Sequence, residues 1–286
     1  MLVDSHTHLD FLPEGRSIEQ VLADAKDAGV DNIVCIGTSV EASIRCVEIA
    51  TKYSTDGISI FASCGIHPED GKADIKKFGL KGCVNELEKI LKQVQDDKQV
   101  VAIGECGLDY YFKSDKQEAT SYREKEFQRK LFIEQIKLSQ KLKLPLIVHC
   151  RNAWEEIFFL MTKLQTPASQ AKRGEPNSKL CGVFHSWTGD WEAAKKALDL
   201  GFYISFSGIV TFKNAQNIQE VAKKTPIERI ILETDSPFLS PEPMRGKQNE
   251  PKNVKIVAEF VAGLRNDSFD NIVTNTSANA KTLFNF

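Results

Sequence analysis

Eight short apolar segments recur along the chain, and helical patterns separate most of them. They are Met1–Ser5, Asn32–Gly37, Ile58–Gly65, Val100–Leu108, Leu144–Cys150, Leu180–His185, Phe202–Ser207 and Arg229–Glu233. Strand-like runs that alternate with longer helices are typical of βαβ units and a parallel sheet. Eight such units in 286 residues predict an α/β fold, a single-domain (β/α)8 TIM barrel over residues 1–286.

The stretches between the segments space their apolar residues by three or four positions. Ile18, Val21, Leu22 and Ala25 are one such set, and Ser17 stands where a helix N-cap is expected.

Helical patterns at Lys252–Leu264 and Asp267–Leu283 follow the eighth segment and predict extra C-terminal helices. The composition of Thr166–Ser178 predicts a surface loop. No Gly/Pro/Ser-rich linker divides the chain, which supports the single domain.

The composition narrows the class of protein. With 42% hydrophobic and 27% charged residues, the chain has the apolar material for a full core and is not a disordered sequence. Its apolar runs fall far short of the ~18–20 residues that span a bilayer, so no membrane association is expected. The first residues also lack the basic start and apolar stretch of a secretory signal.

Seven scattered cysteines do not form the pattern of a disulfide framework. A reducing, cytoplasmic location is therefore predicted, with a nuclear location left open for a eukaryotic source. The formal net charge of −2 excludes the broadly basic surface of many nucleic-acid-binding proteins. Any attraction to a phosphate backbone must then be local, and a bound cation would supply it.

All five histidines lie at or just beyond the C-terminal end of a predicted strand, and two acids end other strands. The residues are His6, His8, His67, His149 and His185, with Glu105 and Asp235. In a TIM barrel these strand ends meet on one face, where active sites lie. Each residue alone could be structural, but His6 and His8 are two apart and point to the same side of a strand. The joint pattern predicts a metal site.

The number of candidate ligands favours two ions. Four histidines and two carboxylates exceed the four ligands of a tetrahedral zinc ion but suit a pair of ions with one bridging carboxylate. Nitrogen and oxygen ligands without thiolate allow Zn, Mg or Mn. Cys106 and Cys150 adjoin ligand candidates but alternate to the other side of their strands, which predicts packing roles.

Two divalent ions and two carboxylates would leave the site net positive, which suits a phosphodiester. His67 and Arg151 are expected on the same rim, and Arg245 and Lys247 in the loop after the last strand. The alternatives are a salt bridge between Arg151 and a rim acid, and plain solvation of Arg245 and Lys247.

The motifs together resemble the TatD family of metal-dependent deoxyribonucleases, within the amidohydrolase-like barrel superfamily. They occur in family order over nearly the whole chain: Asp4–Asp10, Gly65–Pro68, Gly104–Tyr110, Pro145–Arg151, Phe184–Gly189, Ser205–Gly208, Glu233–Pro237, Arg245-Gly246 and Asn249–Pro251. One departure is Ser186-Trp187-Thr188, where the family often has a phenylalanine in the middle, so the shape of the adjoining pocket is open.

The resemblance implies roles for single residues. His6, His8, Glu105 and Asp235 would hold one metal, and Glu105, His149 and His185 the second, with Glu105 bridging. His67 and Arg151 would contact the scissile phosphate, with Arg245 a further substrate contact. Asp235, Glu105 and His67 would be catalytic, and Asp235 would orient or deprotonate the attacking water.

The sequence thus predicts a hydrolase that uses two divalent metal ions to cleave phosphodiester bonds in DNA. The expected enzyme is a monomeric 3′-to-5′ exonuclease acting on single strands or frayed ends. One alternative is an acyl hydrolase such as a D-aminoacyl-tRNA deacylase, an activity also found among TatD-like relatives. The other is a non-catalytic metal-binding barrel.

Overall fold

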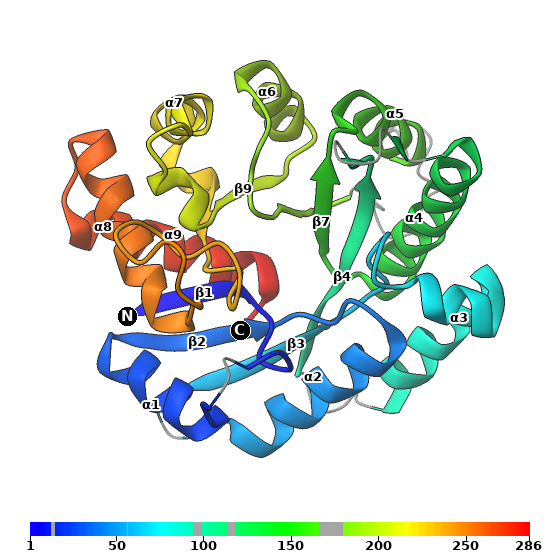
Figure 1. Ribbon diagram of the computed structural model, residues 1–286, viewed down its shortest axis with the longest axis horizontal. Helices are drawn as coiled ribbons and strands as arrows, with labels where there is room; N and C mark the ends of the chain where they lie inside the picture. The colour runs from blue at the N-terminus through cyan, green and yellow to red at the C-terminus, as the bar shows by residue number, and fades with distance from the viewer. Residues whose placement is uncertain (13–14, 56, 94–98, 114–117, 120, 166–179) are drawn as a thin grey trace, which may run out of the picture.

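The structure is a computed structural model, and it describes all residues except 13–14, 56, 94–98, 114–117, 120 and 166–179. The loop predicted at Thr166–Ser178 lies outside the described residues. Figure 1 shows the chain looking onto the ring of strands, with helices around it.

Eight strands form one sheet in the order β1-β2-β3-β4-β7-β8-β9-β10, and all neighbouring pairs are parallel. They are β1 (Leu2–Thr7), β2 (Val30–Cys35), β3 (Ser59–Cys64), β4 (Val100–Asp109), β7 (Leu146–Arg151), β8 (Gly182–Phe184), β9 (Tyr203–Phe206) and β10 (Ile230–Leu232). Each overlaps one of the eight apolar segments, so the predicted barrel is confirmed. The ring is nearly closed by a parallel bridge between Thr7 and Ser236, just beyond β10.

Helices follow the strands in turn: α1 (Ile18–Asp27), α2 (Val40–Tyr53), α3 (Lys72–Gln93), α4 (Tyr122–Leu142), α5 (Trp154–Leu164), α6 (Trp191–Asp199), α7 (Gln216–Lys224) and α8 (Val254–Arg265). Short 3-10 turns are η1 (Gly208–Thr211), η2 (Ile227–Arg229) and η3 (Pro251–Asn253). Ser17 caps α1 as predicted, in a reciprocal capping box with Gln20.

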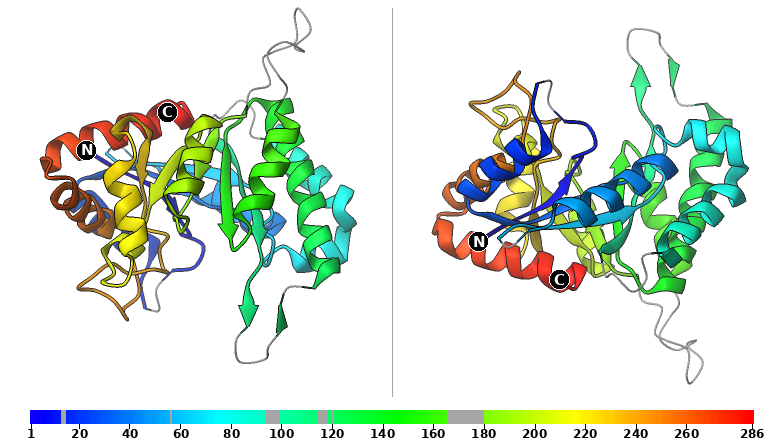
Figure 2. Two further views of the ribbon diagram at one scale, coloured as in Figure 1. Left: turned by 90° about the horizontal axis from the view of Figure 1, so that it is seen from above. Right: turned by 90° about the horizontal axis from the view of Figure 1, so that it is seen from below.

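Two elements refine the expected pattern. The first C-terminal helix, α8, is the eighth helix of the alternation, and α9 (Phe269–Phe284) is additional to it. A two-stranded hairpin of β5 (Phe112–Lys113) and β6 (Glu118–Ala119) follows β4 and was not predicted. Figure 2 shows this hairpin standing out from the barrel.

The helix α9 covers one end of the barrel. Its residues Ala280 and Phe284 pack with inward-facing strand residues such as Val3, Val34 and Ile231. The Ser277 hydroxyl donates to the carbonyl of Met1, and the Asn279 amide to that of Ile230, both at strand starts. The barrel is therefore sealed at the N-terminal ends of its strands, which leaves the opposite end for a site.

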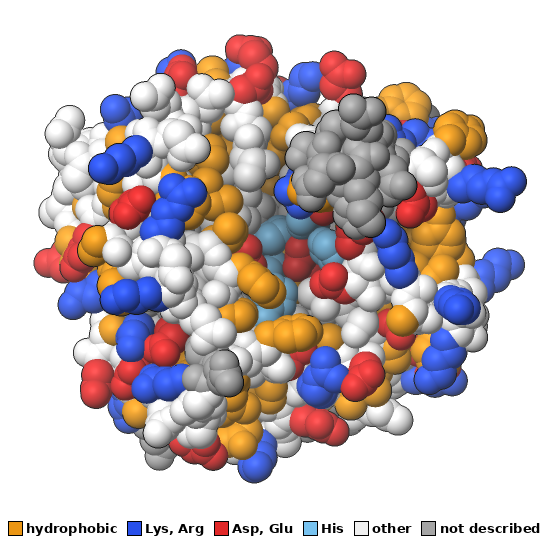
Figure 3. All heavy atoms as spheres, in the orientation of Figure 1, with side chains coloured by type: hydrophobic (Ala, Val, Ile, Leu, Met, Phe, Trp, Pro, Cys, Tyr) orange, Lys and Arg blue, Asp and Glu red, His pale blue; other side chains and the backbone are white. Residues whose placement is uncertain are grey.

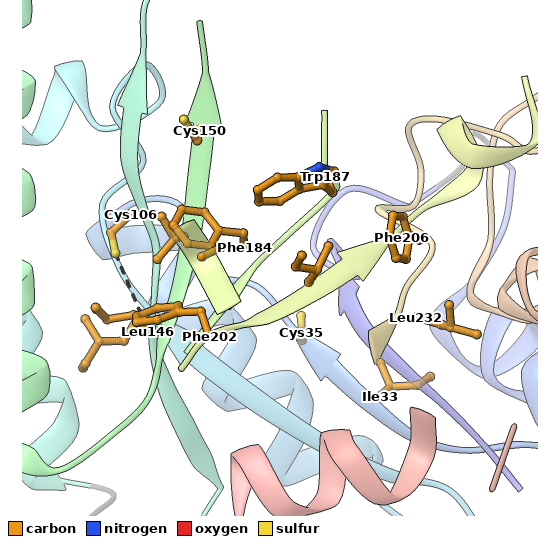
Figure 4. Close-up of a cluster of buried hydrophobic side chains, with 14 of the residues drawn as sticks. Ile33, Cys35, Cys106, Leu146, Cys150, Phe184, Trp187, Phe202, Phe206 and Leu232 are labelled. Carbon is orange, nitrogen blue, oxygen red and sulfur yellow. Dashed lines mark hydrogen bonds between the residues drawn. The ribbon is translucent and has the colours of Figure 1, made fainter. Parts of the chain in front are cut away.

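A larger apolar cluster lies between the strands and the helices. Figure 4 shows Cys106, beside Phe184, and Cys150 among the residues of this cluster. Both thiols are buried, which confirms the packing roles predicted for them. All seven cysteines are free, six of them buried and Cys181 exposed. None of the described helices has the length and apolar character required to cross a membrane.

Candidate metal centre

The five histidines and two acids singled out in the sequence converge at the C-terminal ends of the strands. His6 comes from β1, Glu105 from β4 and His149 from β7, while His8, His67, His185 and Asp235 follow the ends of β1, β3, β8 and β10. Figure 3 shows histidine side chains around a red carboxylate in a hollow at the middle of this face. The predicted convergence is present in the structure.

Glu105 lies at the middle of the cluster, with its two carboxylate oxygens facing different histidines. Oε1 is 2.9 Å from His149 Nδ1 and 2.8 Å from His185 Nε2. Oε2 is 3.4 Å from His6 Nε2. A carboxylate placed in this way can bind two ions, one through each oxygen.

His6, His8 and Asp235 make a second group on the Oε2 side. Asp235 Oδ1 lies 3.5 Å from His6 Nε2 and 3.4 Å from His8 Nε2. Metal–ligand bonds of about 2.1 Å put neighbouring ligand atoms roughly 3.4 Å apart in tetrahedral and roughly 3.0 Å apart in octahedral geometry. The separations around Glu105 and Asp235 are of this size.

Glycines let β4 bring Glu105 to its neighbours. Gly104 has φ 156° and Gly107 has φ 148°, in the left-handed half of backbone space that favours glycine. A Cβ on Gly107 would collide with the carbonyl of His149, and one on Gly104 would lie 2.6 Å from the carbonyl oxygen of Ile147. The close approach of β4 to β7 therefore requires glycine on both sides of Glu105.

Buried ring nitrogens without hydrogen-bond partners indicate that the cluster fits a cation. Both ring nitrogens of His6 are buried without such a partner, as is Nδ1 of His185. Buried polar atoms are rarely left unpaired in native proteins. Neutral imidazoles and ionised carboxylates are also the donor set of Zn²⁺ and related ions. The residues therefore fit a bound divalent metal ion.

The pKa shifts of Glu105 and His8 also indicate a site that suits a cation. Burial alone would raise the pKa of Glu105, but the facing His185 and His67 imidazoles outweigh it and hold that pKa well below its usual range. Burial alone would lower the pKa of His8, but Asp235 and Glu105 raise it to about 9. At His8 and His185 the facing carboxylates thus outweigh burial and raise the pKa, whereas burial lowers the pKa of His6 and His67.

His67 differs from the other histidines in how its ring is held. Its Nδ1 accepts hydrogen bonds from the backbone N–H groups of Glu69 and Asp70, each at 3.3 Å. The ring proton is therefore on Nε2, which lies 3.6 Å from Glu105 Oε1. A nitrogen that carries a proton donates hydrogen bonds and does not bind metal. These hydrogen bonds distinguish His67 from the other histidines, although it also lies close enough to Glu105 and His149 to form a metal-binding group with them.

Three acids that the sequence prediction did not assign support the ligand candidates. Asp109 Oδ2 lies 3.2 Å from His149 Nε2, so it can accept that N–H and turn Nδ1 toward Glu105. Glu233 accepts the backbone N–H of Ser186 and lies 3.5 Å from His185 Nδ1. The only feature of the sequence that could have pointed to Asp109 and Glu233 is that each is an acid inside or directly after an apolar strand.

The third acid, Asp4, holds the loop that carries Asp235. Its carboxylate oxygens accept the backbone N–H and the hydroxyl of Thr234, at 2.8 and 2.6 Å. Burial raises the pKa of Asp4 to about 8. Asp235 itself has φ 58°, a conformation that aspartate tolerates and that aims its side chain at the centre.

The three cationic residues that the sequence analysis singled out, Arg151, Arg245 and Lys247, do not lie in one group. Arg151 ends β7, its side chain is half-exposed, and its guanidinium lies over Tyr111 with the carbon 3.9 Å from the ring centroid. Its Nη1 is 4.0 Å from Asp109 Oδ2, so the alternative role of Arg151, a salt bridge to a rim acid, is a long and weak contact in the structure. Arg245 is exposed in the loop after β10, and its guanidinium lies over the ring of Phe212, with the carbon 4.3 Å from the ring centroid. Lys247 is exposed in the same loop as Arg245.

The residues that replace the usual family pattern after His185 leave that histidine in place. Trp187 is buried, and its ring centroid lies 4.4 Å from that of Trp154 at the start of α5. Its indole N–H donates to the carbonyl of Gly189. Trp187 therefore fills the space between β8 and α5 and belongs to the apolar core.

Comparisons with known proteins agree with the geometry. A model of the family described as TatD related DNase matches residues 3–285. A metal-dependent hydrolase of Buchnera aphidicola subsp. Acyrthosiphon pisum is 38% identical, over 99% of this chain and 99% of its own. The metal-dependent hydrolase YabD of Bacillus subtilis is 37% identical over 99% of each chain.

Solved structures share the fold over the whole length. The crystal structure of YjjV, a TatD homologue of Escherichia coli, matches with a TM-score of 0.82 at 27% identity and covers 100% of this chain and 98% of that one. The family match and the relatives together establish that this chain belongs to the TatD-related DNase family and is a metal-dependent hydrolase.

Proposed function

We propose that the protein is a deoxyribonuclease that hydrolyses phosphodiester bonds with two divalent metal ions. The observation that carries the proposal is the position of Glu105, whose two oxygens face separate groups of histidines. His6, His8, Asp235 and Glu105 would hold one ion, and Glu105, His149 and His185 the other. The ions, Zn, Mg or Mn, would supply Lewis acidity that polarises the phosphoryl oxygens and activates water.

Asp235 would orient the attacking water and accept its proton. Burial alone would raise the pKa of Asp235, but the hydrogen bond to His8 and the charges of His6 and His185 outweigh it and lower that pKa. The carboxylate therefore stays ionised near neutral pH and can accept a hydrogen bond from water.

His67 and Arg151 would act on the phosphate. Burial lowers the pKa of His67 to about 3, so its ring is neutral and donates from Nε2. That N–H can reach a non-bridging oxygen of a phosphodiester held above Glu105. The guanidinium of Arg151 supplies a full positive charge at the half-exposed rim. Both groups would stabilise the charge that develops as phosphorus becomes five-coordinate.

We further propose that the substrate is single-stranded DNA or a frayed end and that cleavage proceeds from the 3′ end. The net charge of −2 does not supply the broad cationic surface of a duplex-binding protein. Local contacts at the metal centre suit a short, flexible strand better. Action as a monomer inside the cell is part of the same proposal.

Two other functions compete with this one. An acyl hydrolase, such as a D-aminoacyl-tRNA deacylase, would use the same ions to polarise a carbonyl oxygen. A non-catalytic metal-binding barrel would still need the ionised Asp235 as a ligand but would not need the donor His67.

The test uses a single-stranded oligonucleotide labelled at its 5′ end, incubated with metal-loaded protein. The proposal predicts a ladder that shortens one nucleotide at a time, slower cleavage of blunt duplex, and no cleavage in chelator. A 3′-labelled copy should release labelled mononucleotide first. Turnover of D-aminoacyl-tRNA without cleavage of DNA would support the acyl hydrolase, and metal binding without either activity would support the non-catalytic barrel.

A further inference from the structure

Two exposed phenylalanines stand beside the metal centre. Seven large hydrophobic side chains are exposed among the described residues, and Phe11 and Phe238 are two of them, at 50% and 54% exposure. A single exposed apolar residue is ordinary, but neighbouring ones at a functional site mark a binding surface. Figure 3 shows hydrophobic side chains along one border of the hollow that holds the histidines.

Both phenylalanines occupy the same place in a turn that begins at a predicted metal ligand. The backbone N–H of Phe11 donates to the carbonyl of His8 at 3.0 Å, and that of Phe238 donates to the carbonyl of Asp235 at 2.9 Å. The two turns are tied to each other because the N–H of His8 donates to the carbonyl of Ser236 at 2.8 Å. The backbone at both rings is therefore fixed relative to the centre.

Phe238 is the better anchored of the two. Its carbonyl accepts the side-chain amide of Asn249 at 2.7 Å, and the same amide donates to Thr234. Its ring centroid lies 5.8 Å from that of His8, with the ring planes inclined by 67°. The contact with His8 is edge-on, and more than half of the phenylalanine stays exposed beside a ligand candidate.

The other side of the centre carries positive charge. Arg151 ends β7 and Tyr111 follows β4. These two strands lie in the middle of the sheet order, whereas β1 and β10 are its two ends. The centre thus has the exposed Phe11 and Phe238 near β1 and β10, and the half-exposed guanidinium of Arg151 near β4 and β7. A nucleotide has the same two parts, because its base is flat with apolar faces and its phosphate is anionic.

We propose that Phe238, assisted by Phe11, is a stacking site for the base of the nucleotide next to the scissile phosphate. The inference rests on the proposed DNA hydrolysis and adds how the strand is held. The base would stack on the phenylalanine while the phosphate is directed across the centre toward Arg151. Every base has a stacking face, so the site would accept all four bases without reading sequence.

The test compares wild type, Phe238→Ala and Phe238→Trp on two single-stranded oligonucleotides. One has ordinary 3′-terminal nucleotides, and the other carries abasic tetrahydrofuran residues at its last two positions. Phe238→Ala should lower kcat/KM on the ordinary strand by about 10-fold, mainly through KM, which is the scale of one lost base stack. It should cause no further loss on the abasic strand, which wild type itself should cleave about 10-fold less efficiently.

Two controls make the result specific. Phe238→Trp should restore stacking and activity, and Phe159→Ala removes a phenylalanine of 63% exposure from α5 and should change nothing. Equal losses for Phe238→Ala on both strands, or no loss on the ordinary strand, would overturn the stacking site while leaving the nuclease in place. Failure of metal-loaded wild type to cleave either strand would instead overturn the proposed nuclease, and the stacking site with it.

Discussion

Glu105 connects the two halves of the candidate centre. One of its oxygens faces His6, and the other faces His149 and His185. Gly104, directly before it on β4, and Gly107, two residues after it, stand where a Cβ would collide with β7. The backbone and the side chain are thus both arranged around this one carboxylate.

Replacing Glu105 by Ala should lower the turnover of single-stranded DNA by at least about 10³-fold, the effect of losing roughly 4 kcal/mol of transition-state stabilisation. The fold should survive, because Glu105 lies outside both hydrophobic clusters. Steady-state kinetics and far-UV circular dichroism test the two parts, with Glu134→Ala on α4 as the matched control. Near-normal turnover of Glu105→Ala with metal present would show that the carboxylate does not bridge.

Arg151 separates phosphodiester hydrolysis from acyl hydrolysis. Arg151→Ala should slow cleavage of DNA or bis(p-nitrophenyl) phosphate by roughly 10²-fold, the scale of one charge-assisted contact of ~2–3 kcal/mol. A neutral carboxylic ester gains charge only in the transition state, so its hydrolysis should hardly change. Arg229→Ala is the matched control, because Arg229 also lies over an aromatic ring, that of Tyr203, but stands just before the N-terminal end of β10. Equal losses on both substrate classes would favour the acyl hydrolase.

At the scale of single residues, the sequence predicted those site residues whose place is set by the end of a strand. The histidines, Glu105 and Asp235 could be assigned because parallel strands bring their C-terminal ends together. Asp109 and Glu233 could not, because a carboxylate that accepts from a ligand's second nitrogen follows no spacing rule. The ring tautomer of His67 depends on the backbone N–H groups of Glu69 and Asp70, which only the fold reveals.

At the scale of elements, helices α4 and α5 are joined to the end of β4 through Glu156. Its carboxylate accepts two hydrogen bonds from Arg129 and one from the hydroxyl of Tyr110. Burial alone would raise the pKa of Glu156, but the hydrogen bonds from Arg129 and Tyr110 outweigh it and lower that pKa below the ordinary 4.5. The stabilisation is therefore present above pH 4.5 and is lost as the pH falls through the lowered pKa.

Glu156→Gln should reduce the free energy of unfolding by about 1 kcal/mol at pH 7, and the difference from wild type should disappear in acid. Urea unfolding from pH 7 to pH 3.5 measures it. Glu134→Gln, which removes an exposed pair with Lys137 on α4, should cost less. A Glu156→Gln deficit that grows as the pH falls would contradict the assigned ionisation.

The additional helix α9 should contribute to the free energy of unfolding but not to catalysis. Phe284 is buried with inward-facing strand residues at the end of the barrel away from the histidines. Phe284→Ala should cost about 3–5 kcal/mol of unfolding free energy and leave kcat/KM within about twofold of wild type. Tyr122→Ala, at a residue 76% exposed, is the control for a lost aromatic ring. A large loss of activity without loss of stability would contradict this division.

The sequence predicted the main strands and helices, but not the short hairpin after β4 or the surface that α9 covers. All eight strands were found because buried parallel strands are apolar along their whole length. The hairpin of β5 and β6 was missed, since two-residue strands are too short to show alternation. That α9 seals the barrel could not be deduced either, because an amphipathic helix does not reveal which surface it covers.

At the scale of the whole molecule, the net charge of −2 is small, and the candidate site for cations lies at one end of the barrel. Asp235 and Glu105 raise the pKa of His8 to about 9 despite burial, so this ligand candidate carries a proton near neutral pH when no metal is bound. Metal binding should therefore release protons and weaken as the pH falls. A nuclease of this kind would depend on its bound ions for attraction to DNA more than on its surface.

The most direct test of this account is to titrate metal-free protein with Mn²⁺ while following both bound metal and cleavage of 5′-labelled single-stranded DNA. The account predicts two ions per chain and full cleavage only as the second ion binds. Full activity with one ion, held by His6 and His8 alone, would contradict the paired centre. Two bound ions without phosphodiester cleavage would contradict the nuclease.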